Sequence, residues 1–349
     1  MLVEFSVENY RSIGEKQTLS MVSYEPQKLH SANLQLFSSA AIYGANASGK
    51  TNFLKAMCAL KKLIIDSAFN HLDISSAYFP FRLAGGKWLN KPTRFYLIFN
   101  VDRRRYDYLI SFDKSKIHEE ILYLTHAQGN DEKCHICFER KAASTQQFLL
   151  LTERDEPKIK TAFRYIVSKL FVEFDRTTVD VLSEDFSLKT DVIKLLNLAD
   201  DSIVDFCQNP RDGIIDFTRK SILQKLTLTT IYNNESEGIV RLFDMAGNWL
   251  LALKNGWTIL IDNKFKDFHP VLARNLVKMF DDPEVNKNNA QLIFTTHDIN
   301  FLEHFDKSRI WFVENNDGSK IYSLLDFATR KNESLQKGYL LGRYGAIPF

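Results

Sequence analysis

The sequence has 349 residues, of which 45% are hydrophobic and 25% are charged, and it contains only 14 glycines and 8 prolines. This composition excludes collagen-like, low-complexity and wholly disordered chains, and the length predicts about two domains. Lys and Arg number 45 against 43 Asp and Glu, which gives a formal charge of +2. That balance disfavours a protein built mainly to coat nucleic acid.

Targeting and redox features predict a cytoplasmic protein without a membrane partner. Glu4 and Glu8 occupy the region where a secretory signal would have basic residues followed by an apolar core. No apolar run approaches the roughly 18–20 residues needed to cross a bilayer. Four cysteines are too few for a disulfide framework at this length.

The first predicted elements are a strand at 2–8 and a second apolar strand at 40–43 that runs directly into Gly44. From Thr51 the apolar spacing changes to the helical period, so strand, glycine loop and helix follow one another. Between 92 and 152 short strands predict an antiparallel sheet layered on the first segment. These strands are expected at 95–101, 106–112, 117–124 and 147–151.

The later elements are mainly helical up to residue 255 and then alternate. Helices are expected at 158–171 and 189–198, and a long amphipathic helix at 236–254 ends at a glycine cap. The alternation of strand and helix that follows predicts a parallel sheet with crossover helices. Its strands are expected at 257–262, 291–296 and 309–314, and its helices at 269–280 and 299–304.

The strongest local motif runs from Gly44 to Thr51 and fits the phosphate-binding P-loop pattern GxxxxGK[ST], with the required strand before it and helix after it. Its glycines let backbone N–H groups surround phosphates, Lys50 would reach the β and γ phosphates, and the Thr51 hydroxyl would ligate Mg²⁺. The residues expected to bind nucleotide are Gly44, Asn46, Ala47, Ser48, Gly49, Lys50, Thr51 and Asn52.

Two later strands supply partners for the P-loop. Asp262 ends the strand at 257–262, where a P-loop protein needs a second magnesium site. His297 follows the next strand, where its side chain would point at the γ-phosphate as a sensor or polarising group. A histidine at a strand end is more often a surface or core residue, so the prediction depends on its place after the Asp262 strand.

The triplet Ser236-Glu237-Gly238 opens the long amphipathic helix. Serine at a helix N-terminus is by default a cap, but an N-terminus opened by Ser and Gly is also an anion site. The order of P-loop, Ser-x-Gly helix, Asp strand and His strand makes the pattern specific.

This order and spacing resemble the SMC-like branch of the ABC ATPases, in particular the stand-alone ATPases of bacterial anti-phage modules such as PARIS, Septu and abortive-infection systems. The resemblance implies an α/β P-loop NTPase of the ABC-ATPase head type, with a mixed-sheet core, a β-rich layer and a helical signature subdomain. It divides the chain into an N-terminal ATPase lobe at 1–152, a helical lobe at 153–255 and the rest of the ATPase core at 256–349. Other segments that carry it are 5–12, 92–95, 269–270, 310–314 and 338–348.

The resemblance also implies ATP and Mg²⁺ as cofactors, bound in a head-to-tail ATP sandwich. Lys50 and Thr51 of one subunit would hold the ATP that Ser236 and Gly238 of the other subunit cover. The expected partner is therefore a second copy, in a homodimer or a higher homo-oligomer. Because the sequence has no room for an appended nuclease domain, a separately encoded effector, a nuclease or toxin, is also expected.

One catalytic position departs from the pattern of this family. Glu normally follows the magnesium Asp, whereas this chain has Asn263, whose amide can orient a water but cannot accept its proton. Phe265 replaces a usual acidic residue, and Ile239 replaces a usual Thr. We expect weak or absent hydrolysis, with Asn263 and His297 at the reacting end, and normal turnover is the alternative. Either His297 or Asp267 partly compensates and hydrolysis is slow, or the protein is an ATP-binding scaffold that stays closed.

Two functions stay open at this point. One is a nucleotide-gated ATPase of an anti-phage system that holds or licenses its effector. The other is a RecF-like DNA-repair ATPase that clamps DNA, which salt-dependent, ATP-stimulated DNA binding would reveal, so nucleic acid stays a candidate partner. A small-molecule kinase or a GTPase is disfavoured, because neither an acceptor site nor an NKxD-type guanine reader is apparent.

Overall fold

The computed structural model describes residues 1–23, 35–68, 74–83, 86–128, 131–141, 156–172, 176–209, 214–220, 227–328 and 333–348. The chain divides into two compact units. The first unit comprises Met1–Val172, Trp257–Asn263 and Gln291–Phe349, and the second comprises Glu173–Gly256 and Lys264–Ala290. The first unit is therefore assembled from both ends of the sequence. Among the described residues, no helix is both long and apolar enough to span a membrane.

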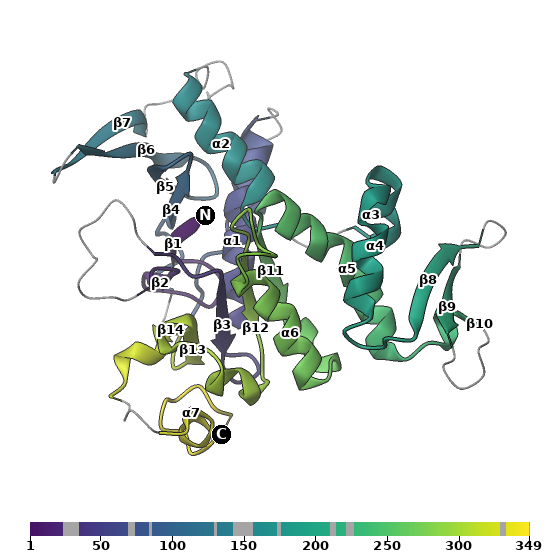
Figure 1. The fold of residues 1–349 in the computed structure, drawn as a ribbon. Coiled ribbons are helices and arrows are strands. Elements are labelled where there is room, and N and C mark those ends of the chain that lie inside the picture. The colour runs from purple at the N-terminus through teal and green to yellow at the C-terminus, as the bar shows by residue number, and fades with distance from the viewer. Residues whose placement is uncertain are drawn as a thin grey trace. The chain divides into compact units, whose positions relative to one another are not determined.

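A five-stranded sheet forms the centre of the first unit, in the order β11-β12-β3-β13-β14 (Figure 1). Its first four strands run parallel, as the sequence pattern predicts, and β3 and β12 are buried along their whole length. The last strand, β14, is antiparallel and was not predicted from the sequence. The strands are β3 (Ser39–Tyr43), β11 (Thr258–Asp262), β12 (Gln291–Thr295), β13 (Ile310–Asn315) and β14 (Ser319–Ser323).

A six-stranded antiparallel sheet forms the β-rich layer of the same unit, in the order β2-β1-β4-β5-β6-β7. Buried residues alternate along most of β4, which confirms the strand expected at 95–101. The strand expected at 147–151 lies outside the described residues. The strands are β1 (Leu2–Glu8), β2 (Gln17–Ser20), β4 (Thr93–Val101), β5 (Arg104–Phe112), β6 (Ile117–Gln128) and β7 (Asp131–Lys141).

The core of the first unit is rich in aromatic side chains. The ring centroid of Phe5, in β1, lies 5.7 Å from those of Phe53 and Phe171 and 6.1 Å from that of Phe95. Helices α1 (Lys50–Ala68) and α2 (Pro157–Lys169) contact each other, and both contribute to this core. Many of the 27 Phe residues therefore have a structural role, as the usual burial of this residue predicts.

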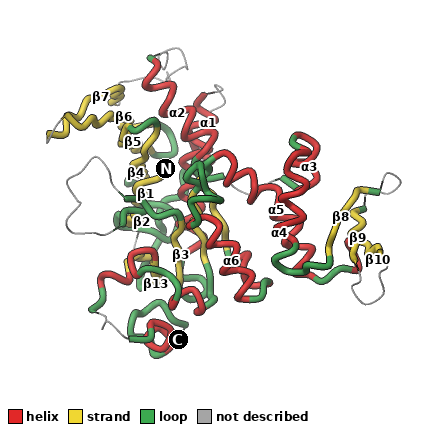
Figure 2. Tube along the Cα trace, viewed as in Figure 1, coloured by secondary structure: helices red, strands yellow, loops and turns green. Residues whose placement is uncertain are grey.

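The second unit combines four helices and a small sheet among its described residues (Figure 2). Helix α5 packs against α3 and α4, begins after Ser236, and ends at Gly256, which has a φ of +67°. The sheet β10-β9-β8 was not predicted, because the burial of β8 does not alternate and its register shifts at Ile203/Asp205. The elements are α3 (Thr178–Glu184), α4 (Lys189–Leu196), α5 (Glu237–Asn255), α6 (Pro270–Asp281), β8 (Ile203–Gln208), β9 (Ile215–Lys220) and β10 (Thr227–Ile231).

Candidate functional site

The loop between β3 and α1 has the backbone that its glycines permit. Gly49 has a φ of +110°, and a Cβ at this position would lie 1.9 Å from the hydroxyl oxygen of Ser319. A Cβ on Gly44 would lie 2.3 Å from the carbonyl oxygen of Val313. Both positions therefore require glycine, because β13 and β14 lie directly against the loop.

Lys50, the first residue of α1, extends its side chain along this loop. Its Nζ donates to the carbonyl oxygens of Gly44 at 2.7 Å and Ala45 at 2.8 Å. Burial lowers the pKa of Lys50 to about 8, although the negative charge of Asp262 acts in the opposite direction. The ammonium is thus mainly charged at pH 7 and loses its proton at pH values around 8.

Ser48 adds a buried hydroxyl to the loop. Its side chain is 3% exposed, and its oxygen has no hydrogen-bond partner among the described residues. Buried hydroxyls are normally hydrogen-bonded, so this one can still donate to a bound oxygen. Together with Lys50 and the loop amides, it fits an anionic phosphate chain.

Asp262, at the end of β11, is held by two threonine hydroxyls. Thr51 Oγ1 donates to Asp262 Oδ2 at 2.7 Å, and Thr295 Oγ1 donates to Asp262 Oδ1 at 2.6 Å. Thr295 is opposite Asp262 in the parallel register of β11 and β12, so both side chains reach the same edge of the sheet. Hydroxyl and carboxylate oxygens are the ligands that Mg²⁺ prefers, so Thr51 and Asp262 fit this metal.

Asn263 is joined to the same cluster through its backbone. Its N–H donates to Thr295 Oγ1 at 2.9 Å, so the Thr295 hydroxyl bridges Asn263 and Asp262. Asn263 has a φ of +52°, in the left-handed region that Asn tolerates better than most residues. Thr295 ends the strand that precedes His297, but no sequence pattern marks it as a site residue.

His297 is exposed and lies in the turn after β12. Partial burial lowers the pKa of His297, the positive charge of Lys50 lowers it further, and Asp262 opposes both effects. The imidazole is therefore mainly neutral at pH 7. This places His297 within the electrostatic influence of the P-loop lysine and the β11 aspartate.

A polar network supports the P-loop from the N-terminal segment. Asn52 Nδ2 donates to Ser12 Oγ at 2.8 Å, and Ser319 Oγ lies 2.7 Å from both Ser12 Oγ and the Ser48 carbonyl oxygen. Ser12 ends the segment 5–12 that carries the family resemblance, whereas Ser319 carries no recognisable sequence signal. Asn52 was predicted as a nucleotide-binding residue, and here its amide contacts this network.

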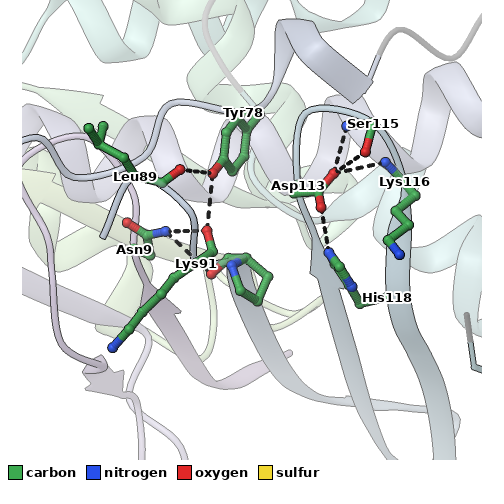
Figure 3. A network of polar contacts seen from close by, with 9 residues as sticks. Asn9, Tyr78, Leu89, Lys91, Asp113, Ser115, Lys116 and His118 are labelled. Carbon is green, nitrogen blue, oxygen red and sulfur yellow. Dashed lines mark hydrogen bonds and ion pairs between the residues drawn. The ribbon is translucent and has the colours of Figure 1, made fainter. Parts of the chain in front are cut away.

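The turn that carries Ser12 is anchored by Asn9. Asn9 Nδ2 donates to the carbonyl oxygens of Trp88 at 3.0 Å and Lys91 at 2.7 Å, and Asn9 Oδ1 accepts from the N–H of Phe81 at 2.9 Å. Figure 3 shows the contact with Lys91 beside that of Tyr78, whose hydroxyl donates to the same carbonyl. These bonds fix the backbone that presents Ser12 to the P-loop segment.

The predicted signature residues belong to the second unit. Ser236 caps α5, with its Oγ accepting from the Ile239 N–H at 3.4 Å, and the Glu237 carboxylate pairs with Arg241 at 2.7 Å. Ser236 and Gly238 line a cavity of about 500 Å³ together with Asp267 and other residues of this unit. The P-loop, Asp262, Asn263 and His297 all belong to the first unit.

Glu235, immediately before this triplet, has a side chain that is only 5% exposed. Arg219 Nη2 donates to Glu235 Oε2 at 2.9 Å and also lies 3.0 Å from Asp200 Oδ2. Glu235 Oε1 has no hydrogen-bond partner among the described residues. Arg219 of β9, which is only partly exposed, therefore connects β9 to the segment that precedes α5.

A glycine loop between a parallel strand and a helix, with a lysine, a threonine and a strand-end aspartate, defines a P-loop ATPase. The profile of one protein family matches residues 39–303, and its description reads "AAA domain, putative AbiEii toxin, Type IV TA system". The chain belongs to this family. An ATPase domain of this kind implies nucleotide binding, usually with Mg²⁺.

The comparison with solved structures agrees on the fold. The head of an SMC protein (SmcHead), in a crystal structure with the C-winged helix domain of ScpA, matches with a TM-score of 0.54 and 13% identity. The match covers 92% of this chain and 97% of that chain. A search of curated proteins finds no significant match. The predicted fold, an α/β P-loop ATPase of the head type, is thereby confirmed, and the family match shows an AAA-type ATPase domain.

Proposed function

We propose that this protein is an ATP-binding ATPase subunit of an anti-phage defence system, with Mg²⁺ held by Thr51 and Asp262. The observation that carries the proposal is the cluster of Thr51, Asp262, Thr295 and Asn263 beside the P-loop lysine. When bound, Mg²⁺ would neutralise phosphate charge. Lys50, the loop amides and the Ser48 hydroxyl would bind and orient the phosphates, and the Thr295 hydroxyl orients the Asp262 carboxylate.

The same cluster supports slow hydrolysis. Asn263 occupies the position next to Asp262, and its neutral amide has no basic group for the proton of an attacking water. His297, mainly neutral at pH 7, can donate one hydrogen bond toward the γ-phosphate, but it adds no full positive charge there. Both features favour a long-lived ATP-bound state over rapid turnover.

The test compares ATP hydrolysis by the wild-type protein, Asn263→Glu and Asn263→Gln. Glu and Gln have the same length and the same difficulty with the left-handed backbone at this position, but only Glu can accept a proton. We expect a slow wild-type rate, an increase on the order of 10²-fold in Asn263→Glu, and no increase in Asn263→Gln. Rapid wild-type turnover that Asn263→Glu leaves unchanged would contradict the proposal.

The proposed assembly is an ATP sandwich between two copies of the chain. Ser236 and Gly238, at the partly exposed N-terminus of a long helix, would cover the ATP held by Lys50 of the other copy. ATP would then shift an equilibrium between open and closed forms by its higher affinity for the closed form. The closed form would hold or license a separately encoded nuclease or toxin.

The family description supports the defence role, because it names an abortive-infection toxin and a toxin–antitoxin system. Purification from cells that carry the neighbouring genes should recover one dominant protein partner. Recovery of the ATPase alone, with and without ATP, would count against this role. ATP-stimulated DNA binding that weakens steeply with salt would instead favour the DNA-clamping alternative.

A further inference from the structure

The turn that carries His297 is attached to the strand that leads into the P-loop. The Thr296 N–H donates to the Ile42 carbonyl oxygen at 3.1 Å, and the Tyr43 hydroxyl donates to the Asp298 carbonyl oxygen at 2.9 Å. Ile42 and Tyr43 are the last two residues of β3. His297 is thus flanked on both sides by hydrogen bonds to the strand that ends at Gly44.

Tyr43 is suited to hold this turn rigidly. Its side chain is fully buried, and burial raises the pKa of its hydroxyl well above the usual value, so the hydroxyl keeps its proton and acts as a donor. The acceptor is a backbone carbonyl, so the bond fixes the path of the chain directly after His297. Thr296 Oγ1 accepts from the Asp298 N–H at 2.9 Å and tightens the same turn.

The segment near the C-terminus holds Tyr43 in place from the other side. The ring of Tyr339, in α7 (Leu335–Leu340), lies edge-on to Tyr43 with centroids 5.7 Å apart, and Phe312 contacts both rings. Gly338 is required here because an added Cβ would lie 2.5 Å from the Tyr344 hydroxyl. The two rings pack against the Tyr43 ring closely enough to fix the direction of its hydroxyl.

The same segment also contacts the chain that follows His297. Glu303 ends the 3-10 helix η5 (Ile299–Glu303), and its Oε1 accepts from Ser334 Oγ at 2.7 Å and from the Gln336 N–H at 3.0 Å. Helix α7 therefore contacts both Tyr43 and η5. Residues 334–339 link the P-loop strand to the His297 turn.

We propose that Tyr43 is a positioning residue that sets the place of His297 relative to the P-loop, and that α7 holds Tyr43 in the required orientation. This inference rests on the proposed role of His297 toward the γ-phosphate. It assigns a function to the C-terminal segment 338–348, which carries the family resemblance.

The experiment compares the full-length wild-type protein with Tyr43→Phe and Tyr322→Phe. Tyr43→Phe keeps the ring and removes only the bond to Asp298. Tyr322→Phe is the matched control, because its hydroxyl donates to the Tyr344 carbonyl oxygen at 2.9 Å within the same aromatic cluster but does not contact the turn. Hydrogen exchange of residues 297–303, the NMR signals of the His297 imidazole and the affinity for ADP are measured.

We expect exchange of residues 297–303 to become about three- to tenfold faster in Tyr43→Phe, because the turn opens more often. The His297 imidazole signals should shift, because the turn no longer holds the ring in one place, while ADP affinity stays unchanged. Tyr322→Phe should match the wild type in the exchange of this turn and in the imidazole signals.

Two results would overturn the inference. One is that Tyr43→Phe leaves the hydrogen exchange of residues 297–303 and the imidazole signals unchanged. The other is an equal change of both in Tyr322→Phe, which would indicate that the aromatic cluster as a whole has loosened. Failure of the wild-type protein to bind ADP would refute the proposed function instead. The exchange and imidazole data would then still decide whether Tyr43 positions the turn.

Discussion

Lys50 is the residue whose protonation should report nucleotide binding most directly. Its pKa of about 8 in the free protein lies below the usual 10.5, so part of the population is neutral at pH 8.5. A bound triphosphate favours the charged form, and binding at this pH should therefore take up a proton. Below pH 7, where Lys50 is already charged, this uptake should disappear.

The consequence for affinity is that ATP binding weakens as the pH rises above 8, by up to about tenfold per pH unit. Calorimetry at pH 8.5 in two buffers with different ionisation enthalpies measures the proton uptake. Lys50→Arg is the control, because its guanidinium stays charged throughout this range. Equal heats for the wild type in both buffers would contradict the assignment of this pKa.

The P-loop motif predicts Lys50 and Thr51 from residue types and spacing, and Asp262 follows from its place at the end of a later apolar strand. Thr295 and Tyr43 could not be predicted in the same way, since each acts through one hydroxyl whose partner comes from a distant strand. Motifs reveal residues that contact a ligand. Residues that hold those contacts in place become visible only when the register of the strands is known.

At the scale of elements, the segment that leads into α5 depends on the ion pair between Arg219 and Glu235. Replacement by Met would leave the buried Glu235 carboxylate without its ionic partner, which costs about 3–5 kcal/mol in unfolding free energy. The double variant Arg219→Met, Glu235→Gln should recover part of this loss, because the uncompensated charge is gone. Urea unfolding of the intact chain measures both values.

Asp200→Asn is the matched control for this prediction. Asp200 also pairs with Arg219, but its side chain is 32% exposed, so its loss should cost about 0–1 kcal/mol. If Asp200→Asn and Arg219→Met were equally destabilising, the buried Glu235 contact would not be the main interaction.

Most elements of the first unit were predictable because their patterns are strong. Strands β3, β11 and β12 are continuous apolar runs because both of their faces are buried. Strand β4 alternates because only one of its faces is buried. The strands β8, β9 and β10 of the second unit were not predictable, because the burial of β8 does not alternate and its register shifts. Their stability depends on aromatic contacts with α5, such as that of Phe206 in β8 with Phe243, whose ring centroids are 5.0 Å apart.

At the scale of the whole molecule, the proposed sandwich predicts complementation between two inactive variants. Lys50→Ala should lack its own nucleotide site, and Ser236→Glu should repel the phosphates held by another copy. A mixture of the two contains pairs with one intact composite site, so ATP-dependent dimers should reappear. Sedimentation with Mg²⁺ and ATP measures these dimers.

Ser183→Glu is the control for the added charge, because Ser183 is also exposed and lies in the second unit. This variant should dimerise like the wild type. Dimers of Lys50→Ala alone, formed with ATP as readily as by the wild type, would exclude nucleotide as the bridging component.

The assembly of the first unit from both ends of the chain has a consequence for its synthesis. Strand β3 is flanked by β12 and β13, and Gln291 bonds to the Phe37 carbonyl across a sequence separation of 254 residues. The P-loop strand therefore leaves the ribosome long before either neighbour exists, and closing so large a loop is slow. The nucleotide site can form only late in translation, so interrupted chains would lack it and expose apolar strand edges to proteases and chaperones.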